Sequence, residues 1–402
     1  LDGFKDINDT FGHDFGDAAL TAAADRLRQA LPPDAFLVRL GADEFAVIRT
    51  GNGASESEEV LANHLLATFQ HPLECGDRTV QIGTSIGAAR FPVDGTDAET
   101  MMRAADLALH AAKAAGRACF QPFRVGMMTE VQRRQDMQED LRRAIAGGEL
   151  EVFLQPQIDL VSGGCIGAEA LLRWRNGEKG WISPGVFIPL AEQTGLILPL
   201  GRFVMEAACR EAMRWEGAAA RATVAVNVSP AQFLYQDIYA EVCEVLEATG
   251  LPSHRLELEI TEGLLMRDQR AAMAVLKRLE DLGVQLAVDD FGTGYSSLSY
   301  LKQFPVQKLK VDQSFVREIE ANASDKMIVR TIVTLASGLG LRTIAEGIET
   351  PAQSRILGEL GCEEGQGYLF ARPMPAADFR SWTSTRVAQA GAQPAILALA
   401  AG

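Results

Sequence analysis

The sequence predicts an α/β protein whose C-terminal part is a TIM-like (β/α)₈ barrel, preceded by a smaller α+β domain. Eight short apolar runs occur after residue 149, and each carries a charged or amide residue at or near its far end. Most are separated by segments with helical spacing, which is typical of repeated βα units. Polar residues at the carboxyl ends of barrel strands mark a catalytic face, so we expect an enzyme. The runs are Glu151–Gln155, Cys165–Arg173, Thr223–Asn227, Arg255–Glu259, Gln285–Asp289, Lys308–Asp312, Arg342–Glu346 and the stretch around Gln366–Leu369.

Composition excludes several classes of protein. The formal net charge of -15 argues against a general nucleic-acid or membrane-surface binder, because no excess of cations is available to meet phosphates. The 6 cysteines are far apart, which favours reduced thiols in a cytoplasmic protein. We expect no membrane contact from this fragment. The chain opens with Leu1, so we also expect it to be a piece of a longer protein, which a membrane anchor or sensor region can precede.

The predicted organisation has four segments. Two apolar runs, Ala35–Leu40 and Phe45–Arg49, flank the short connector Gly41–Glu44 and predict a β-hairpin in the first domain. Leu141 and Ile145 lie on one stripe of a helix that ends at a glycine pair and connects the two domains. The segments are an α+β domain at 1–122, a connector helix at 123–148, the barrel at 149–385 and a flexible tail at 386–402.

Strand alternation predicts which side chains face the barrel interior. In the run that ends at Glu259 the leucines share one face and the glutamates share the other. Helices cover the aliphatic face, so Glu259, Asp289 and Lys310 are expected to point inward near the strand ends. Glu169 shares a face with Arg173 by the same count.

The predicted barrel mouth is too acidic to exist as bare charge. Hard divalent cations relieve the repulsion, and ligation by oxygen atoms with one amide favours Mg²⁺ or Mn²⁺ over zinc. The adjacent Asp289 and Asp290 suit a bridge between two ions, as in two-metal phosphoester hydrolysis, with Lys310 near the water and the phosphate. Each carboxylate taken alone fits a solvated rim residue, but the set from different strands favours a metal site. The set comprises Glu169, Asn227, Glu259, Asp289, Asp290 and Glu346.

At these residues the sequence resembles the EAL family of cyclic di-GMP phosphodiesterases. The signature stands at Glu169-Ala170-Leu171, and the other family motifs cover the whole barrel. They are Gln155-Pro156, Asn227-Val228-Ser229, Glu259-Ile260-Thr261-Glu262, the Asp289–Ser297 loop, Lys310-Val311-Asp312, Glu346-Gly347-Ile348-Glu349-Thr350 and Gln366-Gly367-Tyr368.

The resemblance implies hydrolysis of cyclic di-GMP to linear pGpG with two Mg²⁺ or Mn²⁺ ions. It assigns the six residues of the acidic set to the metal shell, with Glu169, Asp289, Glu346 and Lys310 as the catalytic group, and Lys310 orienting the attacking water. It implies that Glu262 holds the Asp290–Ser297 loop. The positions it gives to ligand contact are Gln155, Arg173 and Gln366. It also implies an antiparallel first barrel strand and a homodimer that forms near the loop after the double aspartate.

The first domain resembles GGDEF diguanylate cyclases, which have a nucleotidyl-cyclase-like α+β fold. The signature appears as Gly41-Ala42-Asp43-Glu44-Phe45, with Ala42 in place of the second glycine. A methyl group there crowds a close backbone approach to a nucleotide, so we expect weak or no cyclase activity. The resemblance assigns nucleotide binding to Asn8, Asp17, Asp43, Glu44, Lys113 and Arg117. Because these residues are retained beside an altered signature, our hypothesis is that the domain responds to GTP as a regulatory module.

Two alternatives remain open from the sequence. The first is a bifunctional enzyme whose cyclase is active. The second is a receptor that binds cyclic di-GMP without hydrolysing it, for which the expected sign is loss of a metal ligand or of the loop after Asp289. The sequence has lost neither.

Overall fold

The computed structural model describes residues 1–402 except 51–56, 77, 268, 293–300 and 391–402. The chain divides into two compact units, Leu1–Asp136 and Met137–Gly402, and each is described by itself. Helix α5 (Gly126–Gly147) contains the boundary between them. The boundary between the two compact units therefore falls inside the segment predicted as the connector helix, 123–148.

The first unit is an α+β domain. The predicted hairpin is confirmed, because β1 and β2 pair antiparallel with Arg39 opposite Phe45. Helix α2 packs on this unit's core with Ala19, Leu20 and Ala23 buried. Its elements are α1 (Phe4–Phe11), α2 (His13–Ala30), β1 (Ala35–Arg39), β2 (Phe45–Arg49), α3 (Glu58–Thr68), β3 (Leu73–Cys75), β4 (Arg78–Val80), β5 (Ile86–Ala88), α4 (Ala98–Ala114) and β6 (Phe120–Pro122).

The second unit is a closed barrel of eight strands. Their order around the barrel is β7-β15-β14-β13-β12-β11-β10-β8, and β7 also pairs with β8. The first strand, β7, is antiparallel to both neighbours, as the resemblance implies, and the other neighbouring pairs are parallel. The strands are β7 (Leu150–Asp159), β8 (Cys165–Asn176), β10 (Thr223–Val228), β11 (Leu256–Thr261), β12 (Gln285–Phe291), β13 (Lys308–Val311), β14 (Arg342–Ala345) and β15 (Glu364–Gly365).

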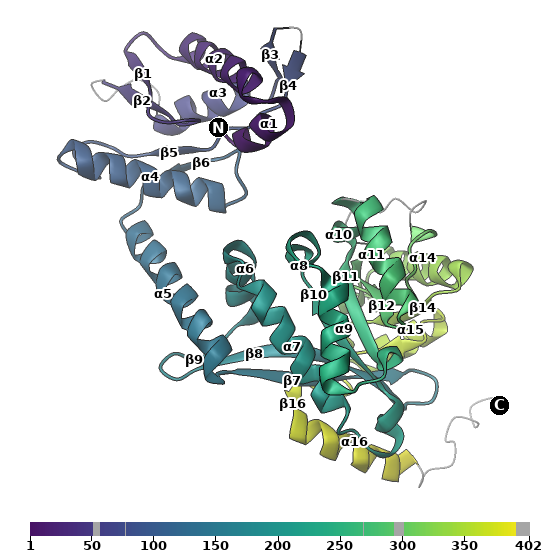
Figure 1. Ribbon diagram of the computed structural model, residues 1–402. Coiled ribbons are helices and arrows are strands. Elements are labelled where there is room, and N and C mark those ends of the chain that lie inside the picture. Colours follow the sequence, from purple (N-terminus) through teal and green to yellow (C-terminus); the bar gives the residue numbers. More distant parts are fainter. Residues whose placement is uncertain (51–56, 77, 268, 293–300, 391–402) are drawn as a thin grey trace. The chain divides into compact units, whose positions relative to one another are not determined.

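Helices cover the barrel from outside (Figure 1). Outward-facing strand residues such as Leu256, Leu258 and Leu309 are fully buried between the strands and these helices. The inward positions are left for polar side chains. The further elements are β9 (Gly180–Ile182), α6 (Pro184–Thr194), α7 (Ile197–Ala212), α8 (Pro230–Tyr235), α9 (Ile238–Thr249), α10 (Glu262–Arg267), α11 (Gln269–Asp281), α13 (Gln313–Arg317), α14 (Ala323–Leu339), α15 (Pro351–Glu359), β16 (Met374–Pro375) and α16 (Ala376–Ala390).

Two expectations for the C-terminal region are wrong in part. The eighth barrel strand is Glu364–Gly365, not the stretch around Gln366–Leu369. After Gln366 the backbone turns, with Phe370 N donating to Gly367 O at 3.1 Å. Helix α16 continues to Ala390, so the first residues of the predicted flexible tail are helical. The rest of that tail, from residue 391, lies outside the described residues.

No helix among the described residues combines the length and the apolar character needed to cross a membrane.

Candidate active site

The predicted site residues come from all eight barrel strands, counting those that directly follow a strand. Inward alternation brings them to the carboxyl end of the parallel strands, where the turn residues after each strand join them. Gln155 lies on β7, Glu169 and Arg173 on β8, Asn227 on β10, Glu259 on β11, Asp289 and Asp290 on β12 and Lys310 on β13, whereas Glu346 directly follows β14 and Gln366 directly follows β15.

Lys310 lies at the centre of the cluster. Its side chain is 1% exposed, and it is surrounded by carboxylates from four strands or strand ends. Nζ lies 2.7 Å from Glu259 Oε2, 2.7 Å from Glu346 Oε1, 3.0 Å from Asp289 Oδ1 and 3.9 Å from Glu169 Oε1. The inward placement predicted for Glu259, Asp289 and Lys310 is therefore confirmed.

Amide side chains hold Glu169 from both sides. Asn227 Nδ2 donates to Glu169 Oε1 at 2.6 Å, and Gln366 Nε2 donates to Glu169 Oε2 at 2.5 Å. Gln366 Nε2 also donates to Gln155 Oε1 at 3.0 Å. Two hydrogen bonds to one carboxylate fix its orientation. The Glu169 carboxylate is thus held in a defined position at the cluster.

Burial is the main cause of the raised carboxyl pKa values at the site. Burial, reinforced by Glu169 and Asp289 against the opposing effect of Lys310, raises the pKa of Glu346 to about 7. Burial likewise raises the pKa of Glu259 well above its usual range. For Lys310, burial opposes the ammonium form, but the surrounding carboxylates, Glu169 foremost, raise its pKa well above the usual value. Lys310 therefore stays a cation.

Sequence reasoning missed Asp312 as a member of the site. Burial and then the negative charges of Asp289 and Asp312 raise the pKa of Asp290 to about 6. Asp312 caps α13, where its Oδ1 accepts from Ser314 N at 3.0 Å. The available signal was its position two residues after Lys310, which places both on the same face of the chain.

The loop after the double aspartate begins with strained backbone. Asp290 has a φ of 51°, in the left-handed region that non-glycine residues rarely adopt. Glu262 Oε2 accepts a hydrogen bond from Gly292 N at 3.3 Å, at the start of the loop that it was predicted to hold. The remainder of the predicted loop, 293–297, lies outside the described residues.

Arg173 lies near the cluster, but its side chain contacts residues of β7 and β8. Its Nη1 donates to Leu172 O at 2.9 Å, and its guanidinium lies 5.6 Å from the centre of the Phe153 ring. Burial lowers the pKa of Arg173, while Tyr368 and Glu169 oppose the shift. Together with the half-exposed Tyr368, it places a cation and an aromatic ring beside the acids.

The donor set fits hard divalent cations, although Lys310 now takes up its carboxylate oxygens. In the part of the chain that the structure describes, no three acidic, histidine or cysteine side chains are arranged to hold a metal ion already. Glu259 is 1% exposed, and its Oε1 is buried without a hydrogen-bond partner among the described residues. Gln366 Oε1 is in the same condition. Buried oxygen atoms left without donors are costly, and a bound cation satisfies them.

In the first unit, the structure gives local surroundings for several of the predicted nucleotide residues. The Asn8 amide packs against Gly16, the residue before Asp17, so closely that a side chain at position 16 would collide with it. Asp43, Glu44 and Lys113 all act electrostatically on the Leu1 amine, whose pKa is lowered chiefly by burial. Arg117 follows α4 with a φ of 65°.

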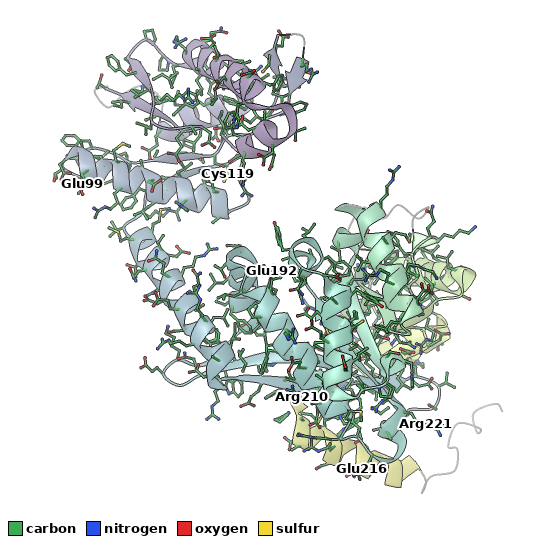
Figure 2. The ribbon with its side chains drawn as sticks, in the orientation of Figure 1. Glu99, Cys119, Glu192, Arg210, Glu216 and Arg221 are labelled. Carbon is green, nitrogen blue, oxygen red and sulfur yellow. The ribbon has the colours of Figure 1, made fainter. Side chains whose placement is uncertain are left out.

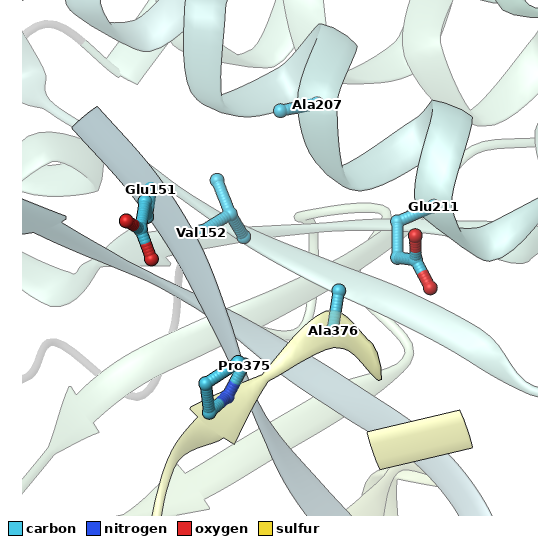
Figure 3. A pocket seen from close by; sticks show the side chains of 6 residues that line it. All are labelled: Glu151, Val152, Ala207, Glu211, Pro375 and Ala376. Carbon is cyan, nitrogen blue, oxygen red and sulfur yellow. The ribbon is translucent and has the colours of Figure 1, made fainter. Parts of the chain in front are cut away.

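A separate cavity of about 270 Å³ has none of the predicted site residues in its lining (Figure 3). Glu211, at its edge, is held by Arg380 and lies 3.5 Å from Arg214. Its charge is therefore already compensated, and we assign the cavity no role. The lining residues are Glu151, Val152, Ala207, Glu211, Pro375 and Ala376.

Comparison with known proteins gives two family matches and many relatives. Residues 138–373 match the EAL domain, and residues 1–119 match the diguanylate cyclase GGDEF domain. The bifunctional diguanylate cyclase/cyclic di-GMP phosphodiesterase MucR of Pseudomonas aeruginosa is 40% identical over 94% of this chain and 55% of its own length. The cyclic di-GMP phosphodiesterase PdeR of Escherichia coli is 37% identical over 95% of this chain and 58% of its own. The chain thus spans about half the length of the curated relatives it matches.

Solved structures match the barrel. The PaMucR phosphodiesterase in complex with c-di-GMP is 43% identical, covers 61% of this chain and 99% of its own, and superimposes with a TM-score of 0.59. The EAL domain of Mycobacterium smegmatis DcpA is 35% identical, covers 60% of this chain and 97% of its own, with a TM-score of 0.50. The chain therefore belongs to the EAL domain family and carries a GGDEF domain ahead of its barrel.

Proposed function

We propose that the barrel is a divalent-metal-dependent phosphodiesterase that hydrolyses one phosphodiester bond of cyclic di-GMP to give linear pGpG. The observation that carries this proposal is the cluster around Lys310, where four carboxylates lie within 3.9 Å of one buried ammonium group and a fifth, that of Asp290, interacts with it electrostatically. Relatives named as cyclic di-GMP phosphodiesterases and a related barrel in complex with c-di-GMP support the choice of substrate.

The charge of the pocket supports two Mg²⁺ or Mn²⁺ ions. With all five carboxylates ionised, one ammonium leaves four negative charges in excess, which two dications would balance. Residues with oxygen atoms suited to hold the ions are Glu169, Asn227, Glu259, Asp289, Asp290 and Glu346. Bound there, such ions would polarise the phosphate and make a water molecule more acidic, and so a better nucleophile.

The protein's own residues supply orientation and positive charge. Because the pKa of Lys310 is raised, Lys310 acts as a hydrogen-bond donor and not as a base. It orients the attacking water and stabilises negative charge that develops on the phosphate. Gln155, Arg173 and Gln366 contact the substrate, and Glu262 fixes the start of the loop after Asp290 through its bond to the Gly292 amide.

Incubation of the purified chain with cyclic di-GMP and Mg²⁺ or Mn²⁺ is expected to yield pGpG, identified by chromatography against a standard. A chelator should stop the reaction, because the carboxylates then lose their counter-charge, and fresh Mg²⁺ should restore it. A chain that binds cyclic di-GMP but releases no pGpG with either metal would support the non-catalytic receptor instead.

We also propose that the GGDEF domain is a GTP-responsive regulator without useful cyclase activity, and that the chain works in the cytoplasm as a homodimer. The replacement of the second signature glycine by Ala42, beside retained nucleotide-binding positions, motivates the regulatory role.

Addition of GTP is expected to change the barrel's rate of hydrolysis or its metal affinity without forming cyclic di-GMP. The cyclase is tested in the Glu169→Ala variant, whose silenced barrel lets any product accumulate. Accumulated cyclic di-GMP would establish the bifunctional alternative. An unchanged rate and metal affinity at millimolar GTP would rule out regulation.

A further inference from the structure

The polar interior of the barrel continues below the active site. Inward side chains from alternate strands of a (β/α)₈ barrel form stacked layers. The strands β8, β11, β13 and β15 contribute an upper layer that belongs to the site: Glu169, Glu259, Lys310 and Gln366. Two residues earlier, the same strands contribute a lower layer: Gly167, Glu257, Lys308 and Glu364.

The lower layer repeats the charge pattern of the upper one. Lys308 Nζ lies 2.8 Å from Glu257 Oε2 and 2.9 Å from Glu364 Oε2. All three side chains are at most 3% exposed. Arg342 Nη1 adds a contact of 2.8 Å to Glu364 Oε1 at the edge of the layer, so two cations balance two anions. Lys308 keeps its charge, because Glu257 and Glu364 outweigh burial and raise its pKa.

Stability alone does not require an ionic layer in this position. Layers inside such barrels usually consist of branched apolar side chains. Replacing a buried ion pair by apolar side chains often leaves the stability of the fold unchanged or raises it. The reason is that the desolvation penalty of the two charges offsets much of their Coulomb attraction. The charges fix the positions of the three side chains, because a buried ammonium group bound to two carboxylates has little freedom to move.

The layer joins strands that do not pair with each other. The order β15-β14-β13-β12-β11 places one strand between Lys308 and each of its partners. The contacts therefore cross the barrel interior and fix β13 relative to β11 and β15. Lys310 and Glu259 stand two residues farther on the same strands, about 7 Å above, and meet at 2.7 Å.

We propose that Glu257, Lys308 and Glu364 are positioning residues that hold Lys310 and Glu259 in register for catalysis. The inference rests on the proposed phosphodiesterase function. Displacement of a catalytic group by about 1 Å costs on the order of 100-fold in rate. Loosening the lower layer should therefore slow the chemical step, while substrate contacts at the mouth, such as Gln155 and Arg173, remain.

The test uses a neutral-layer variant of the whole chain, Glu257→Met/Lys308→Met/Glu364→Met, which replaces all three charged side chains by apolar ones of similar volume. It is expected to fold with a thermal midpoint close to that of the wild type, to lose about 10-fold to 100-fold in kcat, and to keep KM within about threefold. The matched control, Glu211→Gln/Arg380→Met, removes an ion pair from the outside of the barrel and should keep the wild-type kcat.

A neutral-layer variant with wild-type kcat would overturn the proposal, as would an equal loss of kcat in the control. If the variant does not fold, Lys308→Arg decides the question, because it retains the charge and changes only the geometry. That variant should lose kcat at unchanged KM, and full activity in a folded Lys308→Arg protein would refute the positioning role.

Failure of the proposed function is recognised separately, since the wild-type chain would then release no pGpG. In that case calorimetric titration with Mn²⁺ replaces kcat. A displaced Glu259 should weaken Mn²⁺ binding of the neutral-layer variant about tenfold, while equal affinities in variant and wild type would refute the layer's influence on the site.

Discussion

Replacement of Lys310 by methionine is expected to reduce kcat for cyclic di-GMP by about 10²-fold to 10⁴-fold. Methionine occupies a similar volume but carries neither the positive charge nor the hydrogen-bond donors. Lys310 Nζ lies within 3.0 Å of carboxylate oxygens of Glu259, Asp289 and Glu346. Among the described residues, no other lysine or arginine forms a salt bridge with these three carboxylates. The attacking water would lose the ammonium group that orients it, and the phosphate would lose the positive charge that neutralises it.

Divalent cations should still bind the Lys310→Met variant, and at least as tightly as the wild type. Removal of the ammonium frees carboxylate oxygens and makes the pocket more negative. Without metal, however, the variant should unfold at a lower temperature, because buried carboxylates lose their partner. Kinetics, calorimetry with Mn²⁺ and thermal unfolding with and without chelator measure the three effects.

Lys302→Met serves as the matched control, since Lys302 is exposed. It should leave kcat, Mn²⁺ affinity and thermal stability unchanged. Near-normal turnover by Lys310→Met would remove Lys310 from the catalytic step. Loss of Mn²⁺ binding in that variant would show instead that the substitution had disrupted the site as a whole.

Much of the site could be predicted from the alternation of inward and outward side chains along single strands. The period of two in the run ending at Glu259 predicts an inward carboxylate, and the same count predicts an inward Lys310. Their 2.7 Å contact confirms both placements. The roles of these residues remain predictions, because geometry alone does not measure turnover.

Alternation along a strand does not predict side-chain contacts between strands that are not neighbours in the sheet. Alternation places Glu257 and Lys308 inside the barrel just as it places the residues above them. Which inward residues contact each other depends on how far neighbouring strands are shifted in register around the closed barrel. A single sequence does not determine this shift. The lower ionic layer therefore became visible only in the folded barrel.

The end of the last strand was misplaced for a local reason. Apolar residues continue after Gln366, so the run resembles a strand. In the structure Gln366 N donates to Ala345 O at 2.8 Å, and Leu369 N then donates to Ile348 O at 2.9 Å across a turn. Hydrophobic pattern shows burial but does not distinguish a buried strand from a buried turn.

Replacement of Glu169 by glutamine is expected to abolish measurable turnover and to weaken Mn²⁺ binding at least tenfold. The carboxylate accepts from Asn227 Nδ2 at 2.6 Å and from Gln366 Nε2 at 2.5 Å. A glutamine amide can satisfy only one of these donors, and its NH₂ group would face the other. The substitution therefore removes a proposed metal ligand and also sets two amide donors against each other.

Calorimetry separates these effects from a loss of folding. Glu206→Gln is a suitable control because Glu206 accepts from Arg202 and from Arg210, which is labelled in Figure 2, on the outer helix α7. That variant should bind Mn²⁺ and hydrolyse cyclic di-GMP as the wild type does. A folded Glu169→Gln protein with wild-type Mn²⁺ affinity would exclude Glu169 from the metal shell. Because Glu169 is the carboxylate that Asn227 and Gln366 orient, the assignment of both amides to the site would then lose its basis as well.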